Sequence, residues 1–161
     1  MTNKPSLIIA LGSNIEPRNE FLSEAITHLK NKFSLIKISS IYESEPVDYL
    51  EQDLFLNMVA QFEIPNISPE KLLEELQSIE KEMQRHKTID KGPRNIDLDI
   101  IFIGRTKIRS EKLNIPHLSW NQRNFVVYPL LDLDLEDDLR DKVLSFSKEL
   151  TSPKLTEFSV R

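Results

Sequence analysis

IDLDIIFI, residues 96–103, is the stretch that decides the fold, because it is the last strong β-strand that the sequence predicts. Residues two apart on a strand point to the same face, so Asp97 and Asp99 project together while Leu98 and Ile100 project into the core. Neighbouring carboxylates repel each other, and a bound Mg²⁺ is their usual compensation. A solvated acidic face on an edge strand is the alternative interpretation.

The elements before this strand complete a recognisable order. Ser68-Pro69 provides a helix cap followed by proline at the first helical position. Apolar periodicity and β-branched residues predict strands at 7–11, 33–42 and 54–64 and helices at 18–31 and 69–84, with an exposed loop at 43–53. The order β-α-β-β-α-β matches the ferredoxin-like motif, so the predicted fold class is α+β.

Residues 104–161 are less regular and are expected to form a C-terminal extension of short strands and helices. A small edge strand is expected at Lys107-Ile108, a short helix broken at Pro129 within 121–131, and another helix at 141–150. The chain has no repeat, low-complexity tract or linker, and residues 1–161 are expected to form a single domain.

Composition and charge narrow the function classes. The chain has no cysteine and no apolar stretch of membrane-spanning length, so we expect a soluble cytoplasmic protein. Its net charge of −5 argues against non-specific nucleic-acid binding. Residues 85–123, however, hold nine Lys/Arg against four Asp/Glu, which makes this segment +5 and the remainder −10. Such a segment indicates a site for a small polyanion, or a chance cluster of charges on a solvated face.

The surroundings of the two aspartates favour phosphoryl transfer. Gly92-Pro93 is expected to form a stiff corner that places Arg94 beside them. Carboxylates that hold cations, next to guanidinium groups that hold phosphate oxygens, are the arrangement this chemistry needs. The chain has three glycines and neither a P-loop nor a G-x-G-x-x-G motif, so side chains and metal ions must hold the phosphates.

The segment GPRNIDLDII, residues 92–101, resembles the G-P-R-x-x-D-[LIV]-D-[LIVM]-[LIVM] motif of the pterin pyrophosphokinase family. Further stretches similar to that family are 10–14, 39–46, 55–57, 115–117 and 123–125. The resemblance implies transfer of pyrophosphate from ATP to the hydroxymethyl group of 6-hydroxymethyl-7,8-dihydropterin in folate biosynthesis, with release of AMP. It also implies a monomer whose partners are these small molecules. The acidic charge and the lack of a long apolar stretch predict no nucleic-acid or membrane partner.

The same resemblance implies a set of site residues. Asp97 and Asp99 are expected to ligate two Mg²⁺ ions, and Arg85 and Arg94 to grip phosphate oxygens and assist transfer. The implied ATP contacts are Gln77, Glu80, Lys87, Arg94, Ile100, Lys112, His117 and Arg123. The implied pterin contacts are Gly12, Ser44, Val47, Phe55, Asn57, Asp97 and Phe125. The alternatives are core packing for Phe125, a helix-end cation for Arg85 and a solvated face for Gln77 and Glu80.

Two other functions remain open from the residues alone. Another two-metal phosphoryl or nucleotidyl transferase also uses aspartates two apart on a strand, but often needs a third carboxylate, and no obvious one accompanies this pair. A ferredoxin-like RNA-binding module relies on exposed strand aromatics within a K/R-G-F/Y motif, which this acidic chain lacks. The reaction product separates the first alternative from a pyrophosphokinase: a pyrophosphokinase releases AMP, whereas a nucleotidyl transferase releases inorganic pyrophosphate.

Overall fold

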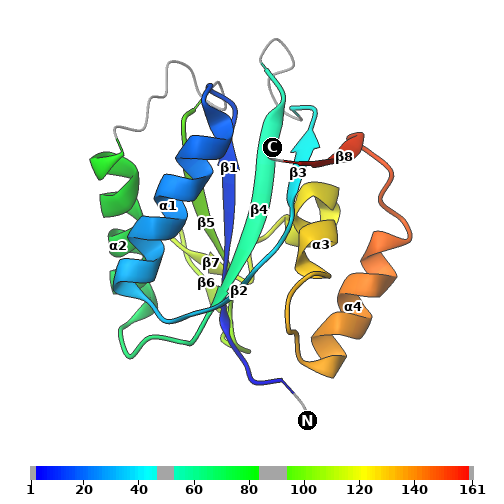
Figure 1. Ribbon diagram of the computed structural model, residues 1–161. Coiled ribbons are helices and arrows are strands. Elements are labelled where there is room, and N and C mark those ends of the chain that lie inside the picture. Colours follow the sequence, from blue (N-terminus) through cyan, green and yellow to red (C-terminus); the bar gives the residue numbers. More distant parts are fainter. Residues whose placement is uncertain (1–2, 47–52, 84–93, 160–161) are drawn as a thin grey trace.

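The computed structural model describes residues 3–46, 53–83 and 94–159 and contains a six-stranded sheet (Figure 1). The strands of this sheet are β1 (Leu7–Ser13), β2 (Leu35–Ile38), β3 (Ile41–Ser44), β4 (Phe55–Phe62), β5 (Asp97–Ile103) and β8 (Leu155–Phe158). A separate two-stranded sheet pairs β6 (Ile108–Arg109) with β7 (Asn114–Ile115). The helices are α1 (Arg18–Lys32), α2 (Pro69–Glu82), α3 (Asn124–Leu130) and α4 (Asp137–Ser147), with a 3₁₀ turn at Trp120–Gln122.

The sheet order is β5-β1-β4-β3-β8, with β2 also paired to β4, and all of these pairings are antiparallel. When β2 and β3 are taken as two halves of one interrupted strand, β1-α1-β2/β3-β4-α2-β5 has the ferredoxin-like order, which confirms the predicted α+β class.

The prediction of one continuous strand over 33–42 was wrong, and Ser39 shows the physical reason. Its buried hydroxyl accepts the Val59 backbone N–H at 2.9 Å, so a side chain replaces a strand carbonyl at this point. The ladder breaks there, and the second half restarts as β3 and extends to Ser44. Glu43 and Ser44 therefore belong to a strand and not to the exposed loop that was predicted at 43–53.

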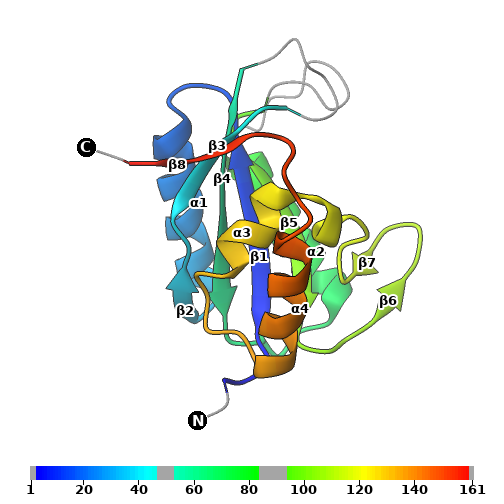
Figure 2. The same ribbon diagram turned by 90° about the vertical axis from the view of Figure 1, so that its right-hand side faces the viewer.

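Helices cover both faces of the sheet, with α1 and α2 on one face and α3 and α4 on the other (Figures 1 and 2). The first core lies under α1 and α2 and includes Leu7, Ile9 and Leu11, whereas Ile8 enters the second core under α3 and α4. In the second core the Trp120 ring meets the Phe102 ring edge-on, with 5.0 Å between centroids. Because both faces of β1 are covered, its sequence is a continuous apolar run.

Both predicted helices before β5 are confirmed. In α2 the Ser68 hydroxyl accepts the Lys71 N–H at 3.1 Å, as a helix cap does. Within the described part of the chain, no helix is long and apolar enough to cross a bilayer.

The C-terminal extension departs from the prediction in three places. Pro129 lies inside α3 instead of breaking it, and the helix ends one residue later because the following N–H groups bond only three residues back. The helix predicted at 141–150 begins earlier, at Asp137, where two acidic residues favour a helix N-terminus. Strand β8 was not predicted, since its four residues, LTEF, show neither an alternating nor a continuous apolar pattern.

Candidate active site

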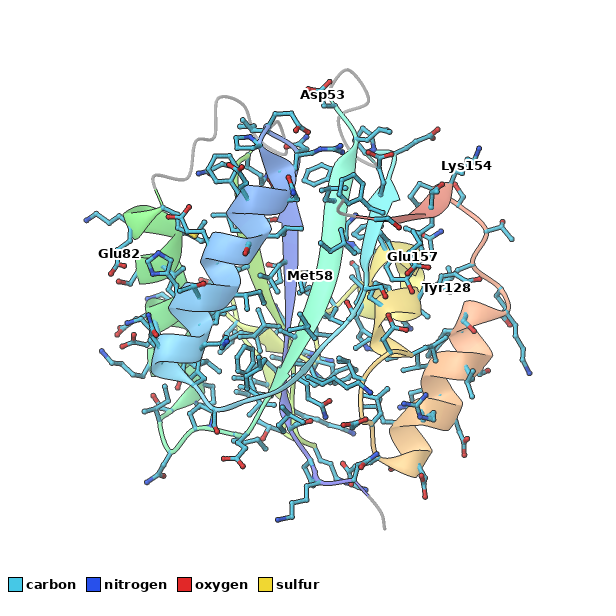
Figure 3. All side chains as sticks on the ribbon, viewed as in Figure 1. Asp53, Met58, Glu82, Tyr128, Lys154 and Glu157 are labelled. Atoms are coloured by element: carbon cyan, nitrogen blue, oxygen red, sulfur yellow. The ribbon has the colours of Figure 1, made fainter. Side chains whose placement is uncertain are left out.

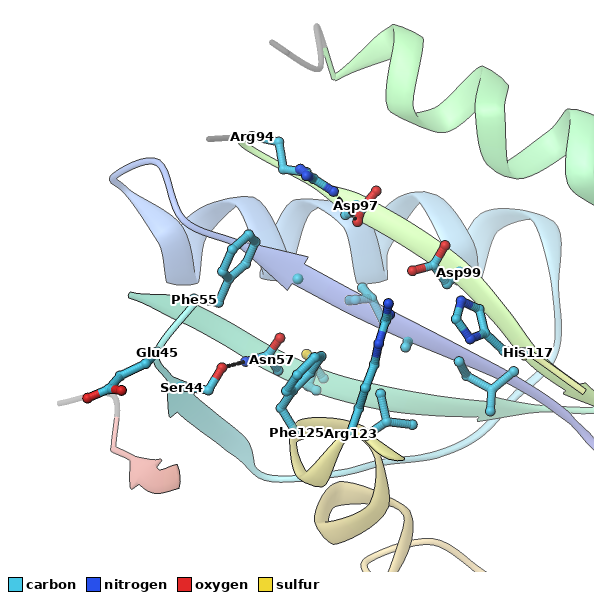
Figure 4. A pocket seen from close by; sticks show the side chains of 16 residues that line it. Ser44, Glu45, Phe55, Asn57, Arg94, Asp97, Asp99, His117, Arg123 and Phe125 are labelled. Atoms are coloured by element: carbon cyan, nitrogen blue, oxygen red, sulfur yellow. Dashed lines mark hydrogen bonds and ion pairs between the residues drawn. The ribbon is translucent and has the colours of Figure 1, made fainter. Parts of the chain in front are cut away.

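A cavity of about 290 Å³ opens at the end of the sheet where β1 and β4 meet β3 and β5 (Figure 4). Side chains from these four strands and from the segment around α3 line it. The lining residues are Ala10, Leu11, Gly12, Ser44, Glu45, Phe55, Asn57, Met58, Arg94, Asp97, Asp99, Ile101, His117, Arg123, Phe125 and Val126.

One half of the cavity combines aromatic rings with a fixed amide. Phe55 on β4 and Phe125 on α3 lie on either side of Asn57 (Figure 4). The Asn57 Nδ2 donates to the Ser44 hydroxyl at 2.8 Å, and both side chains are buried. A Cβ at Gly12 would lie 3.5 Å from the Asn57 Oδ1, so glycine keeps space open beside this oxygen. This half is suited to a flat heterocycle with in-plane donors.

The other half gathers charged groups. Asp97 and Asp99 project from the same face of β5, as expected for residues two apart, and both are partly buried. The Arg94 Nη1 donates to the Asp97 Oδ2 at 2.9 Å, and the Arg94 guanidinium lies 6.0 Å from the centre of the Phe55 ring. Arg123 lies in the same way 5.8 Å from the ring centre of Phe125. The two arginines therefore link the charged half to the aromatic half.

His117 presents a hydrogen-bond donor to the cavity. Its Nδ1 accepts the Ser119 backbone N–H at 3.1 Å, so in the neutral ring the proton is on Nε2. Burial lowers the pKa of His117 below its usual 6.5, and the Arg123 charge lowers it further, against the effect of Asp97. A neutral imidazole that carries its proton on Nε2 is suited to donate to a phosphate oxygen.

Two carboxylates with this spacing fit a hard divalent cation. Magnesium prefers oxygen ligands and is usually held by one or two carboxylates, with water and substrate phosphate completing its shell. In the residues that the structure covers, no group of three or more His, Cys, Asp or Glu could hold a metal ion. Asp97 and Asp99 therefore suit a cation that arrives with a phosphate ligand.

The structure brings ten of the seventeen predicted site residues together around this cavity. They are Gly12, Ser44, Phe55, Asn57, Arg94, Asp97, Asp99, His117, Arg123 and Phe125. Three others, Val47, Arg85 and Lys87, lie outside the described residues.

The four remaining predicted residues do not line the cavity. Ile100 is buried in the core under α1 and α2, and Ile101 lines the cavity in its place. Gln77 on α2 and Lys112 beside β7 are exposed. Glu80 accepts the Leu98 backbone N–H at 2.9 Å and so contacts the β5 strand between the two aspartates.

The sequence analysis missed some of the lining residues, and for two of them a local signal existed. Ala10 is two residues before Gly12 on β1 and lies opposite Asp99, while Gly12 lies opposite Asp97. Ile101 is two residues after Asp99 and also lines the cavity. The strand period of two, extended from the known positions, would have found both residues. Met58 and Val126 carry no comparable signal, because their lining positions depend on how α3 packs over β4.

Comparisons with known proteins agree on one family. The family model "7,8-dihydro-6-hydroxymethylpterin-pyrophosphokinase (HPPK)" matches residues 8–135. The chain is 41% identical over 127 residues to the Bacillus subtilis 2-amino-4-hydroxy-6-hydroxymethyldihydropteridine pyrophosphokinase, covering 78% of this chain and 75% of that protein. It is 47% identical over 129 residues to the folic acid synthesis protein fol1 of Pneumocystis carinii, covering 80% of this chain but only 17% of that protein.

A solved structure supports the fold. The wild-type HPPK-DHPS crystal structure from Plasmodium falciparum matches with a TM-score of 0.65 and 16% identity, over 99% of this chain and 49% of that one. At this identity the likeness concerns the fold alone. This chain thus spans about half of that structure and a smaller part of the fungal protein.

Proposed function

Since the chain belongs to the 7,8-dihydro-6-hydroxymethylpterin-pyrophosphokinase family, we propose from this membership and from the site that it is an ATP-dependent pyrophosphokinase. It transfers the pyrophosphoryl group of ATP to the hydroxymethyl group of 6-hydroxymethyl-7,8-dihydropterin, in folate biosynthesis, and releases AMP. The observation that carries the proposal is a single cavity with an amide between two aromatic rings at one end and two strand aspartates with arginines at the other.

The aromatic half binds the pterin in this proposal. The flat ring stacks against Phe125 and contacts Phe55, which exclude water from its faces. The Ser44 hydroxyl holds the Asn57 amide in one orientation, which leaves the Asn57 Oδ1 to accept an N–H from the ring edge. Gly12 leaves room for the heterocycle beside that oxygen.

The charged half binds the triphosphate. Asp97 and Asp99 hold two Mg²⁺ ions, which when bound neutralise phosphate charge and help to align the hydroxyl with the β-phosphorus. Arg94 and Arg123 donate to phosphate oxygens, and His117 adds its Nε2–H. The work of the protein is therefore positioning and electrostatic stabilisation, with no need for a protein nucleophile.

Other expectations stay predictions. They include phosphate contacts from Arg85 and Lys87, a pterin contact from Val47, and ATP contacts from Gln77, Glu80, Ile100 and Lys112. That residues 1–161 form one domain, and that the protein acts as a monomer in the cytoplasm, are likewise predictions.

Product analysis tests the proposal. The protein is incubated with ATP, Mg²⁺ and 6-hydroxymethyl-7,8-dihydropterin, and AMP and inorganic pyrophosphate are measured separately. We expect AMP that depends on both the pterin and Mg²⁺, lost in Asp97→Ala and retained in Asp134→Ala, whose carboxylate lies outside the cavity and pairs with Lys37 at 3.2 Å. Release of inorganic pyrophosphate instead of AMP would favour a nucleotidyl transferase and overturn the proposal.

A further inference from the structure

Asn14 joins two distant segments of the chain although it is not part of the cavity lining. It directly follows β1 and is 1% exposed. Its backbone N–H donates to the Arg94 carbonyl at 3.0 Å, and its Oδ1 accepts the Arg94 N–H at 2.8 Å. Its Nδ2 donates to the Asp53 carbonyl at 3.3 Å. One buried residue therefore bonds to positions 80 and 39 residues away along the chain.

Each of these segments leads into one half of the cavity. Arg94 donates to Asp97 at 2.9 Å and so belongs to the charged half. Asp53 lies at the cavity end of the sheet, two residues before Phe55 at the start of β4 (Figure 3). Arg94 and Phe55 then approach each other across the cavity, with 6.0 Å from guanidinium to ring centre. Asn14 is thus bonded to the backbone of Arg94 itself and to the backbone two residues before Phe55.

We propose that Asn14 is a positioning residue for the transfer reaction, and that it sets the Arg94–Asp97 pair relative to Phe55 without touching either substrate. This inference rests on the proposed function. Two hydrogen bonds to the same residue fix both the position and the orientation of the Arg94 backbone, whereas one bond would leave it free to rotate. The third bond ties the start of β4 to the same point.

The side-chain chemistry explains why asparagine suits this position. The site needs one acceptor for the Arg94 N–H and one donor for the Asp53 carbonyl, and an amide provides both. Aspartate keeps the acceptor but loses the donor, and alanine loses both. The two substitutions therefore separate the bond to Arg94 from the bond to Asp53.

Gln61 offers a matched control. It is also a 1% exposed amide that bonds to a distant segment, but its partner Asp134 does not line the cavity, whereas the Asn14 partner Arg94 does. Its Nε2 donates to the Asp134 carbonyl at 2.9 Å, and its Oε1 accepts the Asp134 N–H at 2.9 Å. Gln61→Ala removes the same kind of bonds as Asn14→Ala, so it reports the effect of lost stability alone.

The test compares kcat and the two KM values of Asn14→Ala, Asn14→Asp and Gln61→Ala at a temperature where all are folded. A displacement of about 1 Å in a catalytic group can lower the rate about 100-fold, and we expect a loss in kcat of that order for Asn14→Ala. We expect Asn14→Asp to keep more of kcat and to raise KM for the pterin, and Gln61→Ala to keep the wild-type kcat. An equal loss of kcat in Gln61→Ala and Asn14→Ala would overturn the inference.

A second measurement follows the bonds without turnover. Hydrogen exchange of the Arg94 amide should be faster in Asn14→Ala and close to wild type in Asn14→Asp. Faster exchange with an unchanged kcat would also overturn the inference.

A wild-type protein that releases no AMP is a different result and refutes the proposed function. In that case the calorimetric affinity for Mg-ATP decides the inference: a loss in Asn14→Ala that Gln61→Ala lacks supports it, and equal affinities refute it.

Discussion

Neutralising Asp97 should remove most of the stabilisation of the protein by Mg-ATP. Asp97→Asn keeps the shape of the side chain and removes one negative charge from the pair on β5. Unit charges about 4 Å apart contribute about 4 kcal/mol at the effective dielectric constant near a protein surface. The Asp97 side chain is 25% exposed, so water replaces part of this interaction, and Asp99 remains. We therefore expect a net loss of about 2.8 kcal/mol, or about 100-fold in affinity for Mg-ATP.

Thermal unfolding measures this loss directly. Mg-ATP at about 100 times its wild-type Kd should stabilise the wild type by about 2.7 kcal/mol, which for a chain of this length raises Tm by roughly 5–10 °C. At the same concentration a variant with about 100-fold weaker binding gains about 0.4 kcal/mol, or about 1 °C.

Asp134→Asn is the control, because it also removes the charge of an ion-paired aspartate but lies outside the cavity. It should show the full wild-type shift. The reasoning would be refuted by a wild-type shift in Asp97→Asn, or by a shift in the wild type that survives chelation of magnesium.

Three further predictions concern the pterin half and the neighbouring strand. Phe125→Ala removes a stacking surface worth about 1–3 kcal/mol, so KM for the pterin should rise about 5- to 150-fold in steady-state assays; an equal rise in KM for ATP would contradict the assignment. Gly12→Ala places a methyl group 3.5 Å from the Asn57 Oδ1 and 3.6 Å from the Phe55 ring, ordinary contact distances, so Tm should stay near wild type while calorimetry shows weaker pterin binding. Burial and the Asp132 charge raise the pKa of Tyr42 from 10.0 to about 12, so the protonated phenol stabilises the fold below about pH 10 and this contribution is lost as pH rises towards 12. Denaturant unfolding of Tyr42→Phe across that range should therefore show a shallower loss of stability than the wild type, and parallel curves would show that Tyr42 is not the group responsible.

Local rules predicted the chemistry of the site better than its surroundings. The period of two on a strand placed Asp97 and Asp99 on one face, and both line the cavity. The cap at Ser68 and the apolar spacing gave the bounds of α2 to within two residues. Such features depend on neighbours in sequence, which is why a single chain reveals them.

Features that depend on long-range pairing could not be predicted in this way. Strand β8 pairs with β3, with Leu155 opposite Ser44, and its mixed polar and apolar residues give no sign of that partner. The second core, in which Trp120 packs against Phe102 and Phe146, covers a face of the sheet that the predicted ferredoxin-like order leaves open. The bonds of Asn14 likewise join segments that only the folded sheet brings together.

The position of β5 has a consequence for self-association. Within the described residues it lies at the border of the six-stranded sheet, and a border strand exposes backbone groups on which another chain can add a strand. Here Glu80 accepts the Leu98 N–H, and the His117 N–H donates to the Ile101 carbonyl at 3.1 Å. Glu80 on α2 and the His117 backbone therefore occupy two polar backbone groups of β5 to which an added strand could otherwise bond.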